Sequence, residues 1–328
     1  MFTLPLAAVA GDSSPAYNFL NLPSSTTAYG LGGVNITNIS DDINNIDQNP
    51  ALLGPEIESQ VGINYMRYIG ESNFSGIKYG KAAGEHSAWA VGIQYLNYGE
   101  IKAADSEGNI TGSFSPKDVL FNGIYSRDIN DRWRGGINLK FAYSNYEQYS
   151  AMAIATDIGV NYYDPDRDLS FSIVAANLGG QIKRFNDSYD RLPIDLRVGW
   201  AQSFSGLPVR FSITAWNLTK WKLPYYETGD GLENNELKLK ESFSSNLFRH
   251  LIFGAEFIPS DNLSICLGYN YKTRTDMSTY NRNFISGFSL GAQLKVKAFG
   301  VGVAIAQPHT GATTIMLNLS ANISQFIY

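Results

Sequence analysis

The chain has 328 residues, of which 44% are hydrophobic, 13% are aromatic and only 17% are charged. This composition excludes a disordered chain, and the net charge of -5 argues against a nucleic-acid-binding protein, which would carry a basic surface. The sequence holds no run of about eighteen consecutive apolar residues, so we predict no membrane-spanning helix.

The first 59 residues differ from the rest of the chain. Residues 1–10, MFTLPLAAVA, end in the small-x-small pattern of a signal-peptidase site, and we interpret them as the remnant of an export signal. Residues 11–59 are rich in Asn, Ser, Gly and Asp and show no regular alternation of apolar and polar residues. No strand is therefore predicted before residue 60.

From residue 60 onwards, apolar residues alternate with small or polar ones in about fourteen runs. In the segment Trp133 to Ser144, WRGGINLKFAYS, every second residue is apolar or glycine. The apolar faces of these runs carry no charge, whereas the opposite faces carry Lys140, Asp157, Arg197 and Lys295. Because Lys or Arg facing lipid at the bilayer midplane costs roughly 2 to 4 kcal/mol, the apolar faces are expected to contact lipid. We predict that residues 60–328 form a fourteen-stranded antiparallel transmembrane β-barrel in the outer membrane of a bacterial cell.

The connections between the runs alternate in length, as they do in outer-membrane barrels. Tight turns are predicted at 128–132, 164–168, 205–208 and 259–262, and longer polar stretches at 99–117, 179–192, 219–248 and 273–284. If the tight turns are periplasmic, six aromatic residues form a girdle at that end: Trp89, Tyr125, Trp133, Tyr162, Trp200 and Phe257.

The inward positions include many small residues, such as Ala151, Ala153 and Ala155. Side chains of this size fill a lumen of this strand number poorly. We therefore predict that residues 11–59 enter the barrel as a hatch, or plug.

Motifs for catalysis or metal binding are weak throughout. The spaced acids Asp164, Asp166 and Asp168 fit a hairpin turn better than a calcium loop, and the three widely separated histidines are interpreted as surface residues. No Gly-x-Ser-x-Gly motif is present. We predict no enzymatic activity, no cofactor and no metal.

The longest irregular stretch, Thr219 to His250, begins with Trp221, Tyr225 and Tyr226 and then becomes strongly charged. Aromatic residues beside a polar stretch are typical of an interface anchor, so we predict a partner-docking loop. The alternative is that these aromatic residues continue the membrane girdle at the extracellular side.

The segment Gly30 to Leu53, GLGGVNITNISDDINNIDQNPALL, resembles the hatch of FadL-like outer-membrane barrels, whose Asn-Pro-Ala motif matches Asn49, Pro50 and Ala51. A further ordered set of motifs resembles the PorQ-like components of the type IX secretion system: Asn18–Pro23, Phe114–Asp118, Gly135–Ile137, Asn161–Pro165 and Asn177–Gln181.

This resemblance implies a non-catalytic scaffold of the cell-surface attachment complex, with PorU-, PorV- and PorZ-like proteins and outer-membrane lipid as partners. One alternative is a FadL-type transporter or binder of small hydrophobic molecules. The other is a lipid-modifying enzyme of the outer membrane.

Overall fold

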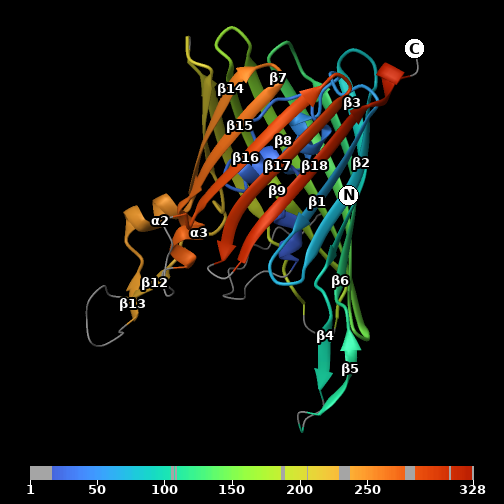
Figure 1. The fold of residues 1–328 in the computed structure, drawn as a ribbon, viewed down its shortest axis with the longest axis vertical. Helices are drawn as coiled ribbons and strands as arrows, with labels where there is room; N and C mark the ends of the chain where they lie inside the picture. Colours follow the sequence, from blue (N-terminus) through green and yellow to red (C-terminus); the bar gives the residue numbers. More distant parts are fainter. Residues whose placement is uncertain are drawn as a thin grey trace, which may run out of the picture.

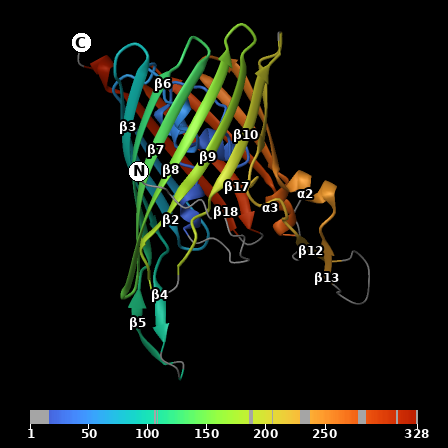
Figure 2. The same ribbon diagram turned by 180° about the vertical axis from the view of Figure 1, so that it is seen from behind.

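A computed structural model describes residues 17–104, 107, 109–185, 189–204, 206–228, 237–277, 285–309 and 312–326. The predicted export-signal remnant, residues 1–10, and the first residues of the predicted hatch, 11–16, lie outside this set. Over the described residues, fourteen antiparallel strands form one closed barrel (Figures 1 and 2).

The strands follow one another around the barrel in chain order, and the last strand pairs with the first to close it. They are β1 (Gln60–Arg67), β2 (Asn73–Ala82), β3 (Ser87–Asn97), β6 (Lys117–Asp128), β7 (Trp133–Tyr146), β8 (Tyr149–Asp164), β9 (Leu169–Lys183), β10 (Asp195–Ser203), β11 (Val209–Ala215), β14 (Leu251–Ser260), β15 (Leu263–Asn270), β16 (Phe288–Val296), β17 (Phe299–His309) and β18 (Ala312–Asn322). The predicted fold class is confirmed, and the first strand of the barrel begins at Gln60.

Shorter elements lie before, between and after these strands. Within residues 17–59 they are η1 (Asn18–Asn21), α1 (Thr26–Gly30), η2 (Ile43–Gln48) and η3 (Pro50–Leu52). The connections contain the hairpins β4 (Ile101–Ala104) with β5 (Ile110–Phe114) and β12 (Tyr225–Thr228) with β13 (Leu237–Lys240), and also α2 (Phe243–Arg249) and α3 (Tyr271–Asp276), while η4 (Ile323–Phe326) follows β18. None of the helices in the described ranges is long and apolar enough to cross a membrane.

The alternation of side chains in the barrel wall follows the sequence pattern. On β7, Ile137, Leu139 and Phe141 are exposed on the outer face, whereas Asn138 and Lys140 are buried on the inner face. This apolar outer surface and the closed antiparallel barrel fit a location in the bacterial outer membrane.

All four predicted tight turns join strands at one end of the barrel, and the longer connections lie at the other end, which we assign as extracellular (Figure 1). The girdle aromatics lie at the end with the tight turns. Trp89 is opposite Tyr125 in the register, and the ring centroids of Trp133 and Tyr162 are 5.1 Å apart.

Three sequence expectations need correction. The longer polar connection predicted at 179–192 begins after residue 183, because strand β9 continues to Lys183. A bulge at Asn177, whose φ of 58° is left-handed, shifts the alternation by one residue, so that Leu178 pairs with Thr156 although Ala175 pairs with Ile158. This shift disguised the strand.

The connection expected to be irregular over Thr219 to His250 contains an ordered hairpin and the helix α2. His250, interpreted from the sequence as a surface residue, is buried. Its ring nitrogens lie 2.8 Å from the carbonyl oxygen of Trp216 and 3.0 Å from that of Trp221. Hydrogen bonds to a backbone that is distant in the sequence explain why a polar residue can be buried here.

Candidate functional site: contacts between the N-terminal segment and the inner wall

The N-terminal segment, residues 17–59, contacts inward-facing residues on opposite sides of the barrel (Figure 1). On one side, the hydroxyl of Ser289 on β16 donates a hydrogen bond of 2.8 Å to the carbonyl of Gly30. On the other side, the amide of Asn49 donates a hydrogen bond of 3.1 Å to the hydroxyl of Ser172 on β9. The segment therefore contacts the inner wall at two separate places; its role as a hatch stays a prediction.

The Asn49-Pro50-Ala51 motif forms a rigid turn. The side-chain oxygen of Asn49 accepts a hydrogen bond of 3.0 Å from the backbone of Ala51, and Pro50 occupies the first position of η3, where its missing N–H costs nothing. The Asn49 amide also donates to the carbonyl of Ile36 at 2.8 Å. The motif thus fixes two parts of the segment to each other and to the wall.

Two glycines in the wall make room for this turn. A β-carbon on Gly159 would lie 2.1 Å from the side-chain oxygen of Asn49, and one on Gly136 would lie 2.4 Å from the carbonyl carbon of Pro50. Real β-carbons almost never approach other atoms this closely. Sequence reasoning found the motif and also the segment Gly135–Ile137, but it did not predict that Gly136 and Gly159 contact the turn, because these contacts join residues about 85 to 110 positions apart.

The inner wall carries three apolar clusters, two of which are separated along the barrel axis by buried polar side chains. An apolar cluster near the extracellular end combines Phe19 and Leu20 of the N-terminal segment with wall residues that include Phe74, Leu96, Leu120, Ala151, Ala153 and Ala155. A second apolar cluster, nearer the periplasmic end, combines Ile43, Ile46, Leu53 and Ile57 of the segment with Ala88, Ala90 and Ile124 of the wall. Between the two lies a set of buried polar side chains, which we call the polar layer: Lys78, Gln94, Asn122, Asn138, Lys140, Asp157, Asp195 and Arg197.

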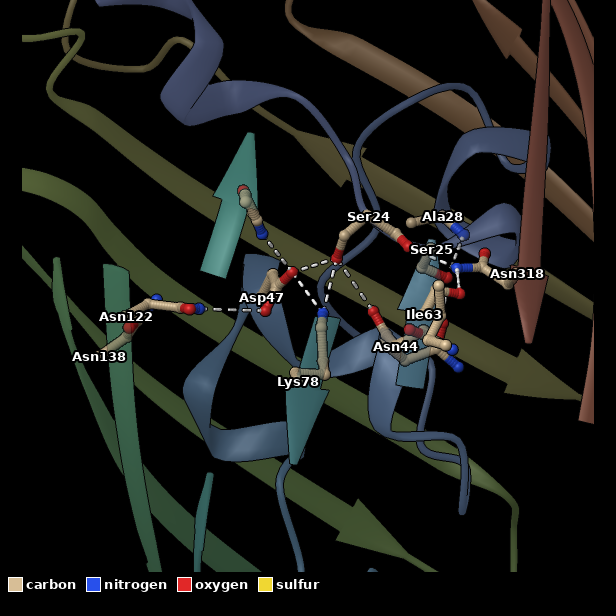
Figure 3. Close-up of polar contacts among 12 residues, drawn as sticks. Ser24, Ser25, Ala28, Asn44, Asp47, Ile63, Lys78, Asn122, Asn138 and Asn318 are labelled. Atoms are coloured by element: carbon tan, nitrogen blue, oxygen red, sulfur yellow. Dashed lines mark hydrogen bonds and ion pairs between the residues drawn. The ribbon is translucent and has the colours of Figure 1, made fainter. Parts of the chain in front are cut away.

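Asp47 of the N-terminal segment is bound by the polar layer (Figure 3). Its carboxylate lies 2.5 Å from the ammonium of Lys78 and accepts a hydrogen bond of 2.7 Å from the amide of Gln94. It also accepts a longer bond of 3.4 Å from the amide of Asn122 and a short one from the hydroxyl of Ser24. Three neighbouring strands, β2, β3 and β6, therefore hold one carboxylate of the segment.

Two more ion pairs complete the polar layer. The Lys140 ammonium lies 2.6 Å from the Asp157 carboxylate, and Nε of Arg197 lies 2.8 Å from the Asp195 carboxylate. Arg197 also donates a hydrogen bond of 2.8 Å to the side chain of Asn21 on the N-terminal segment. Burial of charges is tolerated when they are paired and hydrogen-bonded, as these are.

The sequence analysis predicted that Lys140, Asp157, Arg197 and Lys295 face the lumen. Lys140, Asp157 and Arg197 are buried there, whereas Lys295 lies at the periplasmic rim, about half exposed, and pairs with Asp41 of the segment. Asp47 was missed. The only available signal was its position two residues before the Asn49-Pro50-Ala51 motif.

The three residues of the predicted docking loop do not share one face. Trp221 is exposed and stacks on the His250 ring at 5.0 Å, and Tyr226 is exposed on β12. Tyr225 points to the other side of that strand, where the guanidinium of Arg249 lies 4.8 Å from the centre of its ring. Among the residues that the structure describes, no cluster of three His, Cys, Asp or Glu side chains could hold a metal ion.

Solved structures with similar folds are outer-membrane channels. The toluene transporter TodX of Pseudomonas putida aligns with a TM-score of 0.55 and 10% identity, over 92% of this chain and 99% of its own. A FadL homologue of Pseudomonas aeruginosa aligns with a TM-score of 0.50 and 11% identity, over 91% of this chain and 98% of its own. The chain has the fold of the FadL-type outer-membrane channels.

The monoaromatic hydrocarbon channel CymD has this FadL-type fold too, with a TM-score of 0.50, 12% identity and coverage of 93% of this chain and 97% of its own. These neighbours are channels and a transporter rather than enzymes, which fits the prediction of a non-catalytic protein. No protein-family model matches the sequence, and a comparison with curated proteins finds no match.

Proposed function

We propose that the protein is a channel for small hydrophobic molecules across the outer membrane, closed by its N-terminal segment. The observation that carries this proposal is the extracellular apolar cluster. There, Phe19 and Leu20 of the segment occupy a space whose wall includes Ala151, Ala153 and Ala155. A wall of such small side chains leaves room for an apolar molecule of similar size when Phe19 and Leu20 move away. The likeness to channels named for toluene and monoaromatic hydrocarbons supports this substrate class.

On this proposal, the arrangement described here is the closed state of the channel. Two cavities along the segment have volumes of about 10 and 90 Å³. The smaller lies between Leu20 and the polar layer, and the larger is near the periplasmic rim, beside Asp41 and Lys295. Both are smaller than the apolar cavity of roughly 150 Å³ that accommodates benzene in another protein. A hydrocarbon would therefore fit in either of these cavities only if the segment shifted.

Uptake of radiolabelled toluene into outer-membrane vesicles tests this proposal. Vesicles with the protein should take up toluene faster than vesicles without it. Replacement of Phe19 and Leu20 by Ala should accelerate uptake further, since the replacement empties the apolar cluster. As a matched control, Phe121→Ala and Phe141→Ala remove aromatic rings from the outer face of the barrel and should leave uptake unchanged. Equal uptake with and without the protein would exclude the channel function.

A scaffold role in the type IX attachment complex is the second candidate, and it was suggested by the motif resemblance. The observation that favours it is the filled lumen, because a scaffold needs no open path. The comparisons give this role no support. Co-purification in mild detergent tests it: recovery of PorU-, PorV- or PorZ-like proteins with the chain would support the scaffold, and recovery of lipid alone would count against it.

A further inference from the structure

The connection between β11 and β14, residues 216–250, places a helix with an apolar exposed face outside the barrel. The Phe243 side chain on α2 is 70% exposed, and Leu247 and Phe248 on the same helix are also exposed. Asn246 and Arg249 are buried on the opposite side of the helix. The helix therefore packs with its polar side against the protein and presents its apolar side outward.

Polar contacts on the buried side of α2 hold the helix in this orientation. The guanidinium of Arg249 lies 2.6 Å from the carboxylate of Asp276 on α3 and stacks over the ring of Tyr225. The amide oxygen of Asn246 accepts a hydrogen bond of 2.9 Å from the backbone of Leu223. Because the polar side of α2 is fixed in this way, the outward direction of its apolar side is also fixed.

The apolar side of α2 continues the lipid-facing surface of the barrel. The outer face of β15 carries Ile265, Leu267 and Tyr269, and the next residue in this row is Tyr271 at the start of α3. The ring of Tyr271 lies 5.9 Å from the ring of Phe248 on α2. Figures 1 and 2 show α2 beside the wall, at the extracellular ends of β14 to β16, rather than across the mouth.

Trp221 extends the same surface, since its ring lies 5.7 Å from the ring of Phe243. Exposed lysines are close to it in the chain: Lys220 and Lys222 flank Trp221, and Lys238 and Lys240 lie on β13. The acids of this connection all follow Trp221 by six residues or more in the chain: Glu227, Asp230, Glu233, Glu236 and Glu241. Glu227 is 3.6 Å from Lys240.

Aromatic and aliphatic side chains beside lysines are typical of surfaces that lie in the interface of a membrane. We propose that Trp221, Phe243, Leu247 and Phe248, which we call the α2 platform, lie in the outer leaflet of the outer membrane. Lys220 and Lys222 bind phosphate groups of its lipids. Continuity with the lipid-facing belt favours lipid over a protein partner as the occupant. This proposal does not depend on whether the barrel conducts a substrate.

Spin labels on single cysteines in the full-length protein test the position of the platform. The native Cys266 is buried and should not react, so Phe243→Cys provides one labelled site. Leu139→Cys, whose parent residue is 59% exposed in the middle of the lipid-facing belt, provides a lipid reference. Ile110→Cys provides an aqueous reference, because Ile110 is 64% exposed on the β4–β5 hairpin, which extends away from the barrel (Figure 1).

The proteins are reconstituted into vesicles of phosphatidylcholine with phosphatidylglycerol, and collisions of each label with oxygen and with a water-soluble nickel chelate are measured. The label at position 243 should favour oxygen, as the label at 139 does, and the label at 110 should favour the chelate. A label at 243 that behaves like the one at 110 would overturn the proposal and leave the platform available to a protein partner.

The lysines are tested with spin-labelled lipids. The parent protein should retain phosphatidylglycerol in preference to phosphatidylcholine, and the double variant Lys220→Gln/Lys222→Gln should lower this preference at least about threefold. Lys102→Gln, on β4 of the other hairpin, is the matched control and should not change it. An unchanged preference in the double variant would refute the phosphate contacts while leaving the spin-label result on the platform intact.

Discussion

The ammonium of Lys78 on β2 lies 2.5 Å from the carboxylate of Asp47, and only 3% of the Lys78 side chain is exposed. This pair joins the barrel wall to the N-terminal segment at the level of the polar layer. Its position between two apolar clusters explains how the segment is held in one register: sliding along the axis would place Asp47 against apolar side chains, where an unpaired charge is costly.

The first prediction concerns this pair. Lys78→Met leaves Asp47 buried without its cation, and removal of one partner of a buried pair typically costs about 3 to 5 kcal/mol. We expect the segment to detach more often, which should appear as additional conductance steps in planar bilayers. The double variant Lys78→Met/Asp47→Asn carries no unpaired charge there and should conduct less than Lys78→Met alone. Identical conductance of both variants and the parent would show that the pair does not hold the segment.

The second prediction compares adjacent glycines on β7. Gly136→Val places a side chain where Pro50 lies and should displace the Asn49-Pro50-Ala51 turn from the wall. Gly135 lies on the outer face, where a β-carbon would meet only Ile129 at an ordinary 3.5 Å, so Gly135→Val is the matched control. Limited proteolysis should cleave the N-terminal segment faster in Gly136→Val than in Gly135→Val or the parent. Equal rates would mean that the turn does not depend on the gap at Gly136.

The third prediction tests the two faces of the wall. Leu139→Arg places a charge in lipid near the middle of the membrane and should reduce barrel stability by roughly 2 to 4 kcal/mol. Ser320→Arg places the same charge in the polar periplasmic cavity, which is lined by three acids (Asp41, Asp42 and Glu56) and two lysines (Lys295 and Lys297), and it should be tolerated. Lys140 is unsuitable as a neutral control, because its removal would leave Asp157 unpaired. Urea unfolding in detergent, followed by the heat-dependent shift on gels, measures both variants; equal loss of stability would contradict the assignment of faces.

Much of this architecture could be predicted from the sequence because it is periodic. Leu139 and Lys140 have opposite environments simply because successive residues of a strand point to opposite faces. The contacts of the N-terminal segment have no such local signal. Asp47 meets Lys78 and Gln94 only after the barrel has closed, and the bulge at Asn177 broke the period on which the strand assignment depended. The face on which a strand residue lies was predictable from the alternation along the chain. Contacts between residues far apart in the sequence were not.

The last prediction concerns the periplasmic turn at Asp168, which lies outside the membrane-spanning strands. Burial alone would raise the pKa of Asp168, but hydrogen bonds from Ser203 and Arg210 and the charge of Arg210 outweigh burial and lower the pKa below 3.8. Because the pKa is lower in the folded barrel than in the unfolded chain, ionised Asp168 stabilises the folded barrel. This contribution is fully present above about pH 4, where the carboxyl group is ionised in the unfolded chain too. It should be lost as the pH falls through the lower pKa of the folded state.

Asp168→Asn isolates this contribution, since Asn tolerates the left-handed backbone that Asp168 adopts at a φ of 43°. At pH 7 the variant should be less stable than the parent by about 1 kcal/mol, and the difference should shrink as the pH falls through the lowered pKa of Asp168 in the folded barrel. Thermal unfolding of the detergent-solubilised barrel at pH 7 and at a series of pH values below 3.8 measures this difference. Asp166→Asn is the matched control. Asp166 is largely exposed, and its carboxylate lies 3.9 Å from the guanidinium of Arg132, which is a long and solvent-screened ion pair. Its replacement should therefore change the stability little at any of these pH values. A difference between Asp168→Asn and the parent that shows no decrease as the pH is lowered below 3.8 would show that the carboxylate charge is not what stabilises the turn.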